Sequence, residues 1–465
     1  MNAPVATDSR PRREAVFMPL LSLSAKMALV QTAPLLMSVL VAGLIAKHST
    51  HSYAAYALMA SFNLPIFIAA ASMLQALYYL GGRAMGQGRH EDYEAAMLAG
   101  FVFASLVALV CSGLSVLSSQ ALSLFGVDPD LAQAAHGFGI ANAVGLWPAL
   151  LMVVFRVHAS LRQRAGLASG LYVVAALCGS AWALLAMQLW GHDLAQASEM
   201  TVGAVSLSNW VMAALGLGAL LGMKPLQLNW RAHGSRIQEA LAQLFAVGWP
   251  VGAVVLLDSL MLAFAALIAG RYWPQTVPVH SAAALWVTFA LVLPLGIAQA
   301  VVQYVAVAHA RGDVQERNRR AVLAMLLTLM TGAVTLLAFS LAAVPLGAAV
   351  LGPVAYQADT ASALHQIMPW AGLVLCMQAV IVVGAAILRG LGQTRAPLLQ
   401  ALFGYGLVGI GGQWLLAVVY GGALLGLWQG LAAGFGLTAV ALCWRCAREL
   451  ELSTQKGGVY RPTLP

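Results

Sequence analysis

Two stretches of this 465-residue chain decide its fold: LPIFIAAASMLQALYYLGGRAMGQGR, residues 64–89, and LPLGIAQAVVQYVAVAHARGD, residues 293–313. Each begins with Leu-Pro, continues as an apolar run and ends in a turn that contains glycine and arginine. An apolar run of about 20 residues is long enough to cross the hydrocarbon layer of a bilayer. Because the two stretches lie in opposite halves of the chain, they predict an internally duplicated membrane protein.

The composition supports this prediction. The chain is 61% hydrophobic and 9% charged, with a mean hydropathy of +0.83, whereas soluble domains carry about 25% charged residues. A soluble chain this apolar could not cover its own surface with polar groups. Apolar runs predict helices at 26–46, 53–80, 95–119, 134–157, 166–190, 199–222, 240–270, 280–309, 320–344, 364–389, 397–420 and 422–445.

The basic residues fix an orientation for these helices. If the N-terminus is cytoplasmic, all of the 24 Lys and Arg residues except Lys47 and Arg271 fall on the cytoplasmic side. Such a bias follows the positive-inside rule, and it accounts for the net charge of +8 without a nucleic-acid partner. We therefore expect a multi-pass plasma-membrane protein, in the inner membrane if the source is bacterial, with both termini cytoplasmic.

The longest polar connection, 224–239, has six predicted helices on each side. It divides the chain into an N-terminal six-helix lobe (1–225), a cytoplasmic linker (226–238) and a C-terminal six-helix lobe (239–465). Two lobes with the same orientation are a plan that membrane transporters use. The predicted fold class is an all-α integral membrane protein with twelve transmembrane helices in two pseudo-symmetric six-helix lobes.

Asp258 is the one acidic residue of sixteen that lies deep within a predicted helix. Its neighbours one turn away, Val254, Val255, Met261 and Leu262, are all apolar. An ionisable residue inside the membrane is expensive and by default suggests a functional site. Burial favours the neutral form of a carboxylate, which suits reversible protonation. The alternative is a protonated Asp258 that only joins neighbouring helices by a hydrogen bond.

Four segments carry a resemblance to a known family: LFGVDPDLA at 124–132, GWPVGAVVLLD at 248–258, VLPLGIAQA at 292–300 and LRGLGQTRAP at 388–397. Each motif is weak alone, but their order and spacing resemble those of the multidrug and toxic compound extrusion (MATE) family over nearly the whole chain. The resemblance implies a secondary active antiporter that exports small organic cations or other amphipathic compounds, driven by a proton or sodium gradient.

The same resemblance implies an ion-coupling site. Asp258 falls where the family has a glutamate in its seventh helix, and Gln378 falls where it has an aspartate in its tenth. The family's first-helix aspartate has no counterpart, since residues 37–47 contain no acid. One carboxylate in place of two halves the negative charge offered to a bare cation, so we favour protons over sodium. No catalytic residue, metal site or cofactor is expected.

Further polar residues are candidates for the substrate cavity. Gln299, Gln303 and Tyr304 lie on the eighth predicted helix, where each serves either the cavity or an interhelical hydrogen bond. Trp286 falls where the family has an aromatic facing the cavity, and it would stack on a cationic substrate or face lipid. Pro34 and Pro250 occupy equivalent places in the two halves, as hinges or as plain kinks.

Two other functions remain as alternatives. A flippase for a lipid-linked precursor, from the same wider superfamily, would need buried Arg or Lys to hold phosphates, and the sequence shows none deep in a span. A membrane enzyme would need converging His, Asp or Ser groups, which one isolated Asp258 does not supply. We therefore expect a monomeric exporter of one small-molecule substrate that the sequence does not name.

Overall fold

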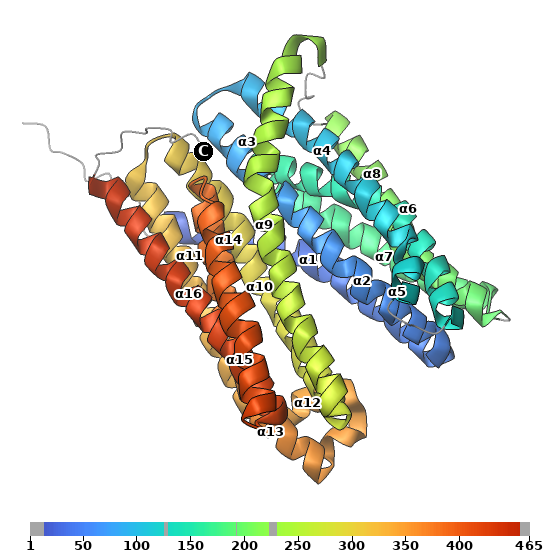
Figure 1. Cartoon of the computed structure of the whole chain (residues 1–465). Helices are drawn as coiled ribbons and strands as arrows, with labels where there is room; N and C mark the ends of the chain where they lie inside the picture. Colours follow the sequence, from blue (N-terminus) through green and yellow to red (C-terminus); the bar gives the residue numbers. More distant parts are fainter. Residues whose placement is uncertain (1–13, 125–128, 192, 223–229, 456–465) are drawn as a thin grey trace, which may run out of the picture.

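The computed structural model describes residues 14–124, 129–191, 193–222 and 230–455, and within these ranges the chain is helical and contains no strand (Figure 1). The elements are α1 (Glu14–His48), α2 (Thr50–Leu74), α3 (Leu77–Gly86), α4 (His90–Val116), α5 (Ser118–Leu124), α6 (Pro129–Leu161), α7 (Ala165–Leu189), α8 (Leu194–Gly222), α9 (Trp230–Tyr272), η1 (Pro274–Thr276), α10 (Val277–Ala310), α11 (Val314–Leu341), α12 (Ala343–Leu351), η2 (Gly352–Tyr356), α13 (Ala358–Gly390), α14 (Arg395–Ala401), η3 (Leu402–Ile410), α15 (Gly411–Gln413), η4 (Trp414–Val419) and α16 (Ala423–Gln455).

Twelve of the described segments are long and apolar enough to cross a membrane, which confirms the predicted number. Several extend beyond their predicted ends, because a helix continues through the polar region where apolar periodicity gives no signal. The second span, His51–Gly86, contains a break that the sequence did not predict. At Gln75 and Ala76 the backbone N–H groups bond three residues back, to Ser72 and Met73, and the chain turns from α2 into α3.

The duplicated motif ends in the same backbone conformation in both halves. Gly88, after α3, has φ of 70°, and Gly312, after α10, has φ of 74°. A left-handed conformation of this kind favours glycine, which lacks a Cβ. In the second half Asp313 also caps α11, because its Oδ1 accepts a hydrogen bond from the Glu316 N–H at 2.9 Å. The glycines shared by the two motifs are therefore required by the turns.

The spans alternate in direction, so the turns at 87–89, 162–164, 311–313 and 391–394 lie at one end of the molecule, with the start of α9 (Figure 1). We call this the basic end and its opposite the far end. The predicted linker 226–238 lies at the basic end; residues 226–229 are outside the described ranges, and 230–238 form the first turns of α9. There Ile237 packs against Ala95 and Leu98 of α4, and Arg236 pairs with Glu91.

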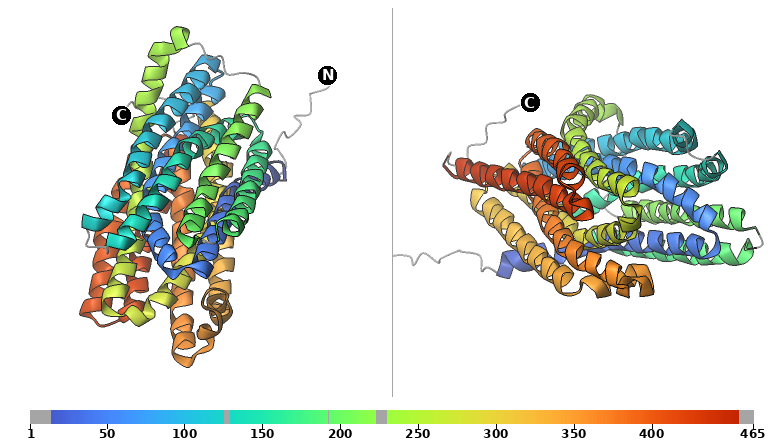
Figure 2. Two further views of the ribbon diagram at one scale, coloured as in Figure 1. Left: turned by 90° about the vertical axis from the view of Figure 1, so that its right-hand side faces the viewer. Right: turned by 60° about the horizontal axis from the view of Figure 1, so that its bottom comes forward.

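The two six-helix lobes share a hydrophobic core near the basic end. It includes Leu77 and Val153 of the first lobe and Val302 and Leu388 of the second. Toward the far end the first lobe has a separate core of its own residues, built on Val41, Met59, Phe138 and Met187. In Figure 1 the far ends of α2 and α5 lie on one side and those of α12 and α13 on the other, and Figure 2 shows the same molecule from two further sides.

Glycines bring the lobes into close contact where they join. A Cβ on Gly82 would lie 2.9 Å from the Cβ of Ala306, and one on Gly86 would lie 2.6 Å from that of Ala310. Real Cβ atoms essentially never approach other heavy atoms this closely. The contact between α3 and α10 therefore depends on the two glycines of the first duplicated motif.

Candidate functional site

The structure brings Asp258 and Gln378 together inside the second lobe. Asp258 lies on α9 and Gln378 on α13, and the Gln378 Nε2 donates a hydrogen bond to Asp258 Oδ1 at 3.1 Å. Gln378 is only 2% exposed, and its Oε1 has no partner among the described groups. The amide therefore presents a donor to the carboxylate and keeps an unused acceptor beside it.

Two residues near this pair were missed by the sequence analysis. Tyr405, 2% exposed, lies within electrostatic range of Asp258, and its ring packs edge-on against Phe435 with centroids 5.1 Å apart. Gln413 is fully buried, and its Nε2 contacts the backbone oxygen of Met261, one turn beyond Asp258, at 3.4 Å. Its Oε1 has no partner in the described part of the chain.

Tyr405 belongs to an unusual helix. Residues Leu402–Ile410 and Trp414–Val419 form π-helix within the eleventh span, and π-helical segments are rare and frequent at functional sites. Glycines allow this segment to pack closely: a Cβ on Gly409 would lie 2.7 Å from the Met261 side chain, and one on Gly404 would overlap Thr438. The glycine-rich run 402–413 was the available sequence signal.

The other predicted cavity residues lie apart from this pair, and no described hydrogen bond links them to it. Gln303 accepts a hydrogen bond from Ser160 Oγ at 3.0 Å and donates to the backbone oxygen of Gln299 at 3.1 Å. Gln299 is 2% exposed, and neither its Nε2 nor its Oε1 has a described partner. Tyr304 lies under the Arg320 guanidinium at 3.8 Å. Trp286 Nε1 donates to the Leu346 oxygen at 2.8 Å.

The two hinge candidates lie inside unbroken helices, Pro34 in α1 and Pro250 in α9. Pro250 stands between Gly248 and Gly252, where α9 meets α2. A Cβ on Gly248 would lie 2.7 Å from the Met73 oxygen. The α9 proline is therefore placed at the joint between the lobes, and hinge motion at either proline stays a prediction.

The structure also buries three arginines that lie near the ends of predicted helices in the sequence. Arg156 of α6 is 4% exposed, Arg317 of α11 is 2% exposed and Arg389 of α13 is 6% exposed, and all three belong to segments that can span a membrane. Each lies close in sequence to a turn at the basic end, which made them resemble ordinary loop charges. The helices packed around them bury them, so the chain has buried arginines that the sequence did not reveal, near the ends of their spans and not deep within them.

Twelve spans in two lobes, with buried polar centres between and within them, define a polytopic membrane transporter. The MatE family model matches residues 23–176 and 250–415. The chain belongs to this family, the multidrug and toxic compound extrusion transporters, and it is a transporter, not an enzyme.

Relatives agree over most of the chain. It is 26% identical over 436 residues to the probable multidrug resistance protein NorM of Deinococcus radiodurans, covering 92% of this chain and 94% of that one. It is also 26% identical over 440 residues to multidrug resistance protein NorM of Burkholderia vietnamiensis, covering 91% and 92%.

Solved structures share the fold. The chain aligns with the eukaryotic MATE transporter AtDTX14 with a TM-score of 0.81 at 19% identity, covering 95% of this chain and 98% of that one. It aligns with a mutant of the Vibrio cholerae MATE transporter VcmN with a TM-score of 0.83 at 15% identity, again covering 95% and 98%.

Proposed function

We propose that this chain is a proton-coupled antiporter that exports small amphipathic or cationic compounds of the multidrug type, and that Asp258 carries the exchanged proton. One observation supports the coupling role above all: Asp258 is joined to Gln378 inside the second lobe, and no described base neutralises it. A carboxylate held away from basic partners is stabilised by taking up a proton.

Gln378 suits a proton better than a sodium ion. An amide has both a donor and an acceptor, so its NH₂ group can serve the carboxylate, and its Oε1, after the amide rotates, can accept from the carboxylic acid. Gln378 Oε1 has no other described partner to lose in that rotation. Sodium would need several oxygen ligands around one carboxylate, and the second carboxylate of the family's site is absent here.

Proteoliposomes test this proposal. We expect a pH gradient to drive export of a fluorescent cationic dye by the wild type, and a sodium gradient at constant pH to drive none. Asp258→Asn should reduce export to the level of empty vesicles, since the amide cannot ionise, and Asp258→Glu should retain part of it. Full export by Asp258→Asn would overturn the coupling role.

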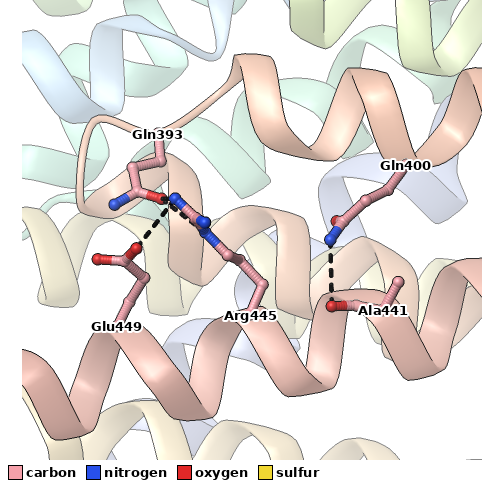
Figure 3. A network of polar contacts seen from close by, with 5 residues as sticks. All are labelled: Gln393, Gln400, Ala441, Arg445 and Glu449. Carbon is pink, nitrogen blue, oxygen red and sulfur yellow. Dashed lines mark hydrogen bonds and ion pairs between the residues drawn. The ribbon is translucent and has the colours of Figure 1, made fainter.

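A matched control is available in the same lobe. Gln400 of α14 donates from Nε2 to the Ala441 oxygen of α16 at 3.1 Å, as Figure 3 shows, and no described hydrogen bond joins it to Asp258. Gln378→Ala should lower export, whereas Gln400→Ala should leave it near the wild-type rate. Equal losses in the two variants would mean that Gln378 acts only through packing.

We further propose that the protein is a monomer in the plasma membrane with its basic end in the cytoplasm, as the distribution of Lys and Arg supports. Labelling in a cysteine-free background tests the orientation. A cysteine at the exposed His90, at the basic end, should react only from the cytoplasmic side, and one at the exposed Tyr356, at the far end, only from outside. The reverse pattern would invert the orientation.

A further inference from the structure

A second polar centre lies where the two lobes join, and the coupling site does not use it. Its members come from both lobes and from six helices or turns. We call it the seam cluster; it consists of Gln31, Gln75, Tyr78, Arg156, Ser160, Gln303 and Arg389. Ser160, one turn after Arg156 on α6, bonds Gln303 of the other lobe, and Gln75, three residues before the fully buried Tyr78, bonds Arg389, so both arginines lie beside the joint between the lobes.

The seam cluster contains two positive charges and, among the described residues, no carboxylate that pairs with either. Some other basic residues of this chain do have acids, whereas the buried Arg317 bonds to the Asn318 side chain. Arg445 lies 3.0 Å from Glu449, with Gln393 on its other side, as Figure 3 shows, and Arg320 pairs with Glu316 at 2.5 Å. Buried charges are normally paired, because an unpaired one costs several kcal/mol.

Each seam arginine is held by one neutral amide. Arg156 Nη1 donates to Gln31 Oε1 at 3.2 Å, and Arg389 Nη1 donates to Gln75 Oε1 at 2.9 Å. The Nε of each is buried without a described partner. A guanidinium has five donors in a planar fork that matches carboxylate and phosphate oxygens. The two amide oxygens therefore occupy positions that an anion would fill better.

The cluster is divided between the lobes. Arg156 belongs to the first lobe and Arg389 to the second, and two hydrogen bonds cross between them, Arg389 to Gln75 and Ser160 to Gln303. Parting the lobes at the basic end breaks both bonds. It also takes Gln75 away from Arg389, so that the two guanidinium groups line opposite walls of the opening.

From this geometry we propose that Arg156 and Arg389 bind an anionic group, a carboxylate, sulfonate or phosphate, on the exported compound when the lobes part at the basic end. Closure of the seam then returns Gln75 to Arg389 and displaces the anion. This inference rests on the proposed export function and extends it: the favoured cargo is an amphipathic compound that bears an acid group, alone or beside a cationic one.

The test compares two dyes that differ only in charge, N-dansylglycine and its neutral amide, bound to the purified full-length protein in detergent. Gly86→Leu should favour the parted form, because its side chain would meet Ala310 and Val307. In this background we expect the carboxylate dye to bind about tenfold more tightly than the amide, as hydrogen bonds to charged groups allow. Equal affinities for the two dyes would overturn the inference.

Substitutions then locate the effect. Arg156→Gln and Arg389→Gln should each remove most of the preference for the carboxylate dye, while Arg156→Lys should keep part of it. Arg445→Gln is the matched control. Its preference for the carboxylate dye over the amide dye should equal that of the Gly86→Leu protein without this substitution. Because the preference is a ratio within one preparation, partial unfolding of a variant does not change it. An undiminished preference in both Gln variants would overturn the assignment.

The source of the anion is tested by competition. A soluble acyl-glycine should displace the dye, whereas nanodiscs of phosphatidylglycerol should do so no better than nanodiscs of phosphatidylcholine. Selective displacement by phosphatidylglycerol would assign the site to a lipid headgroup and overturn its assignment to the cargo. Failure of the proposed function would be distinguishable from failure of this inference. A wild type that shows no proton-coupled export would still prefer the carboxylate dye if the two arginines bind it.

Discussion

The two lobes have the same helical plan, but the charge that each holds against an amide from another of its own helices has the opposite sign. In the first lobe Arg156 lies buried with the oxygen of Gln31, and in the second Asp258 lies with the nitrogen of Gln378. Neither charge has a described ionic partner, and each is held by an amide that turns its complementary end toward it. The turns at Gly88 and Gly312 are alike in the two halves, whereas these two pairs of a charge and an amide are not.

The largest expected effect is on stability, and its sign distinguishes the seam arginines from ordinary ones. Arg156→Met should stabilise the protein by about 3 kcal/mol, because it removes a buried charge that lacks an acid. Arg445→Met should instead destabilise it, since Glu449 loses its partner. Denaturant unfolding in detergent micelles measures both. Destabilisation by Arg156→Met would show that an anion or an acid already compensates this charge in the first lobe.

A second carboxylate in the second lobe would sharpen the contrast. Gln378→Asp places two acids side by side, which doubles the negative charge offered to a cation. We expect this variant to gain stabilisation by sodium, about 2.7 kcal/mol at a concentration of 100 times Kd. The comparison is thermal unfolding in sodium against choline chloride, at a pH where both acids ionise. Equal stabilisation of the wild type by sodium would contradict the preference for protons.

A smaller effect is expected where the lobes touch. Gly86→Ala adds a Cβ that would lie 2.6 Å from the Cβ of Ala310 and 2.8 Å from the Val307 oxygen, and it should destabilise the closed basic end by about 2 kcal/mol. The control is Gly43→Ala, since a Cβ there meets nothing within 4 Å. Thermal unfolding reports the stability of each variant. Equal stability of the Gly86→Ala and Gly43→Ala proteins would mean that the contact between α3 and α10 can loosen without cost.

The smallest effect concerns one hydrogen bond of the seam. Ser160→Ala leaves the buried Oε1 of Gln303 without its donor, which should cost about 1 kcal/mol. Ser61→Ala is the matched control, because Ser61 is exposed and bonds within its own helix. This substitution should lower the free energy of unfolding by less than Ser160→Ala does. Denaturant titration of the two variants under identical conditions gives the difference. A cost at Ser160 no larger than at Ser61 would remove this bond from the set that joins the lobes.

The sequence predicted the features that a single helix or turn determines. Twelve apolar spans, the turns at Gly88 and Gly312 and the isolation of Asp258 within its span all follow from local pattern. The pairing of Asp258 with Gln378 could be predicted only because the family resemblance aligned two distant helices.

The remaining features depend on contacts between helices, which hydropathy does not encode. Arg156 and Arg389 resemble cytoplasmic charges in the sequence, and contacts with other helices bury them, beside Gln31 of the same lobe for Arg156 and beside Gln75 of the other lobe for Arg389. Tyr405 lies on the π-helical part of the eleventh span, and nothing in the apolar composition of this span specifies that winding. The break at Gln75 could likewise not be predicted, because the apolar run continues through it without interruption.

The seam between the lobes sets how small a driving force can run the transporter. It is crossed by the bond of Arg389 to Gln75, worth about 1.5–3 kcal/mol net because its donor is charged, and by that of Ser160 to Gln303, worth about 1 kcal/mol. One proton moving down one pH unit releases about 1.4 kcal/mol. Because these energies are comparable, the polar bonds of the seam should not prevent turnover under a shallow gradient, while the hydrophobic core that the lobes share must part as well. For the same reason the cycle should reverse readily, drawing its cargo inward when the outside concentration outweighs the proton gradient.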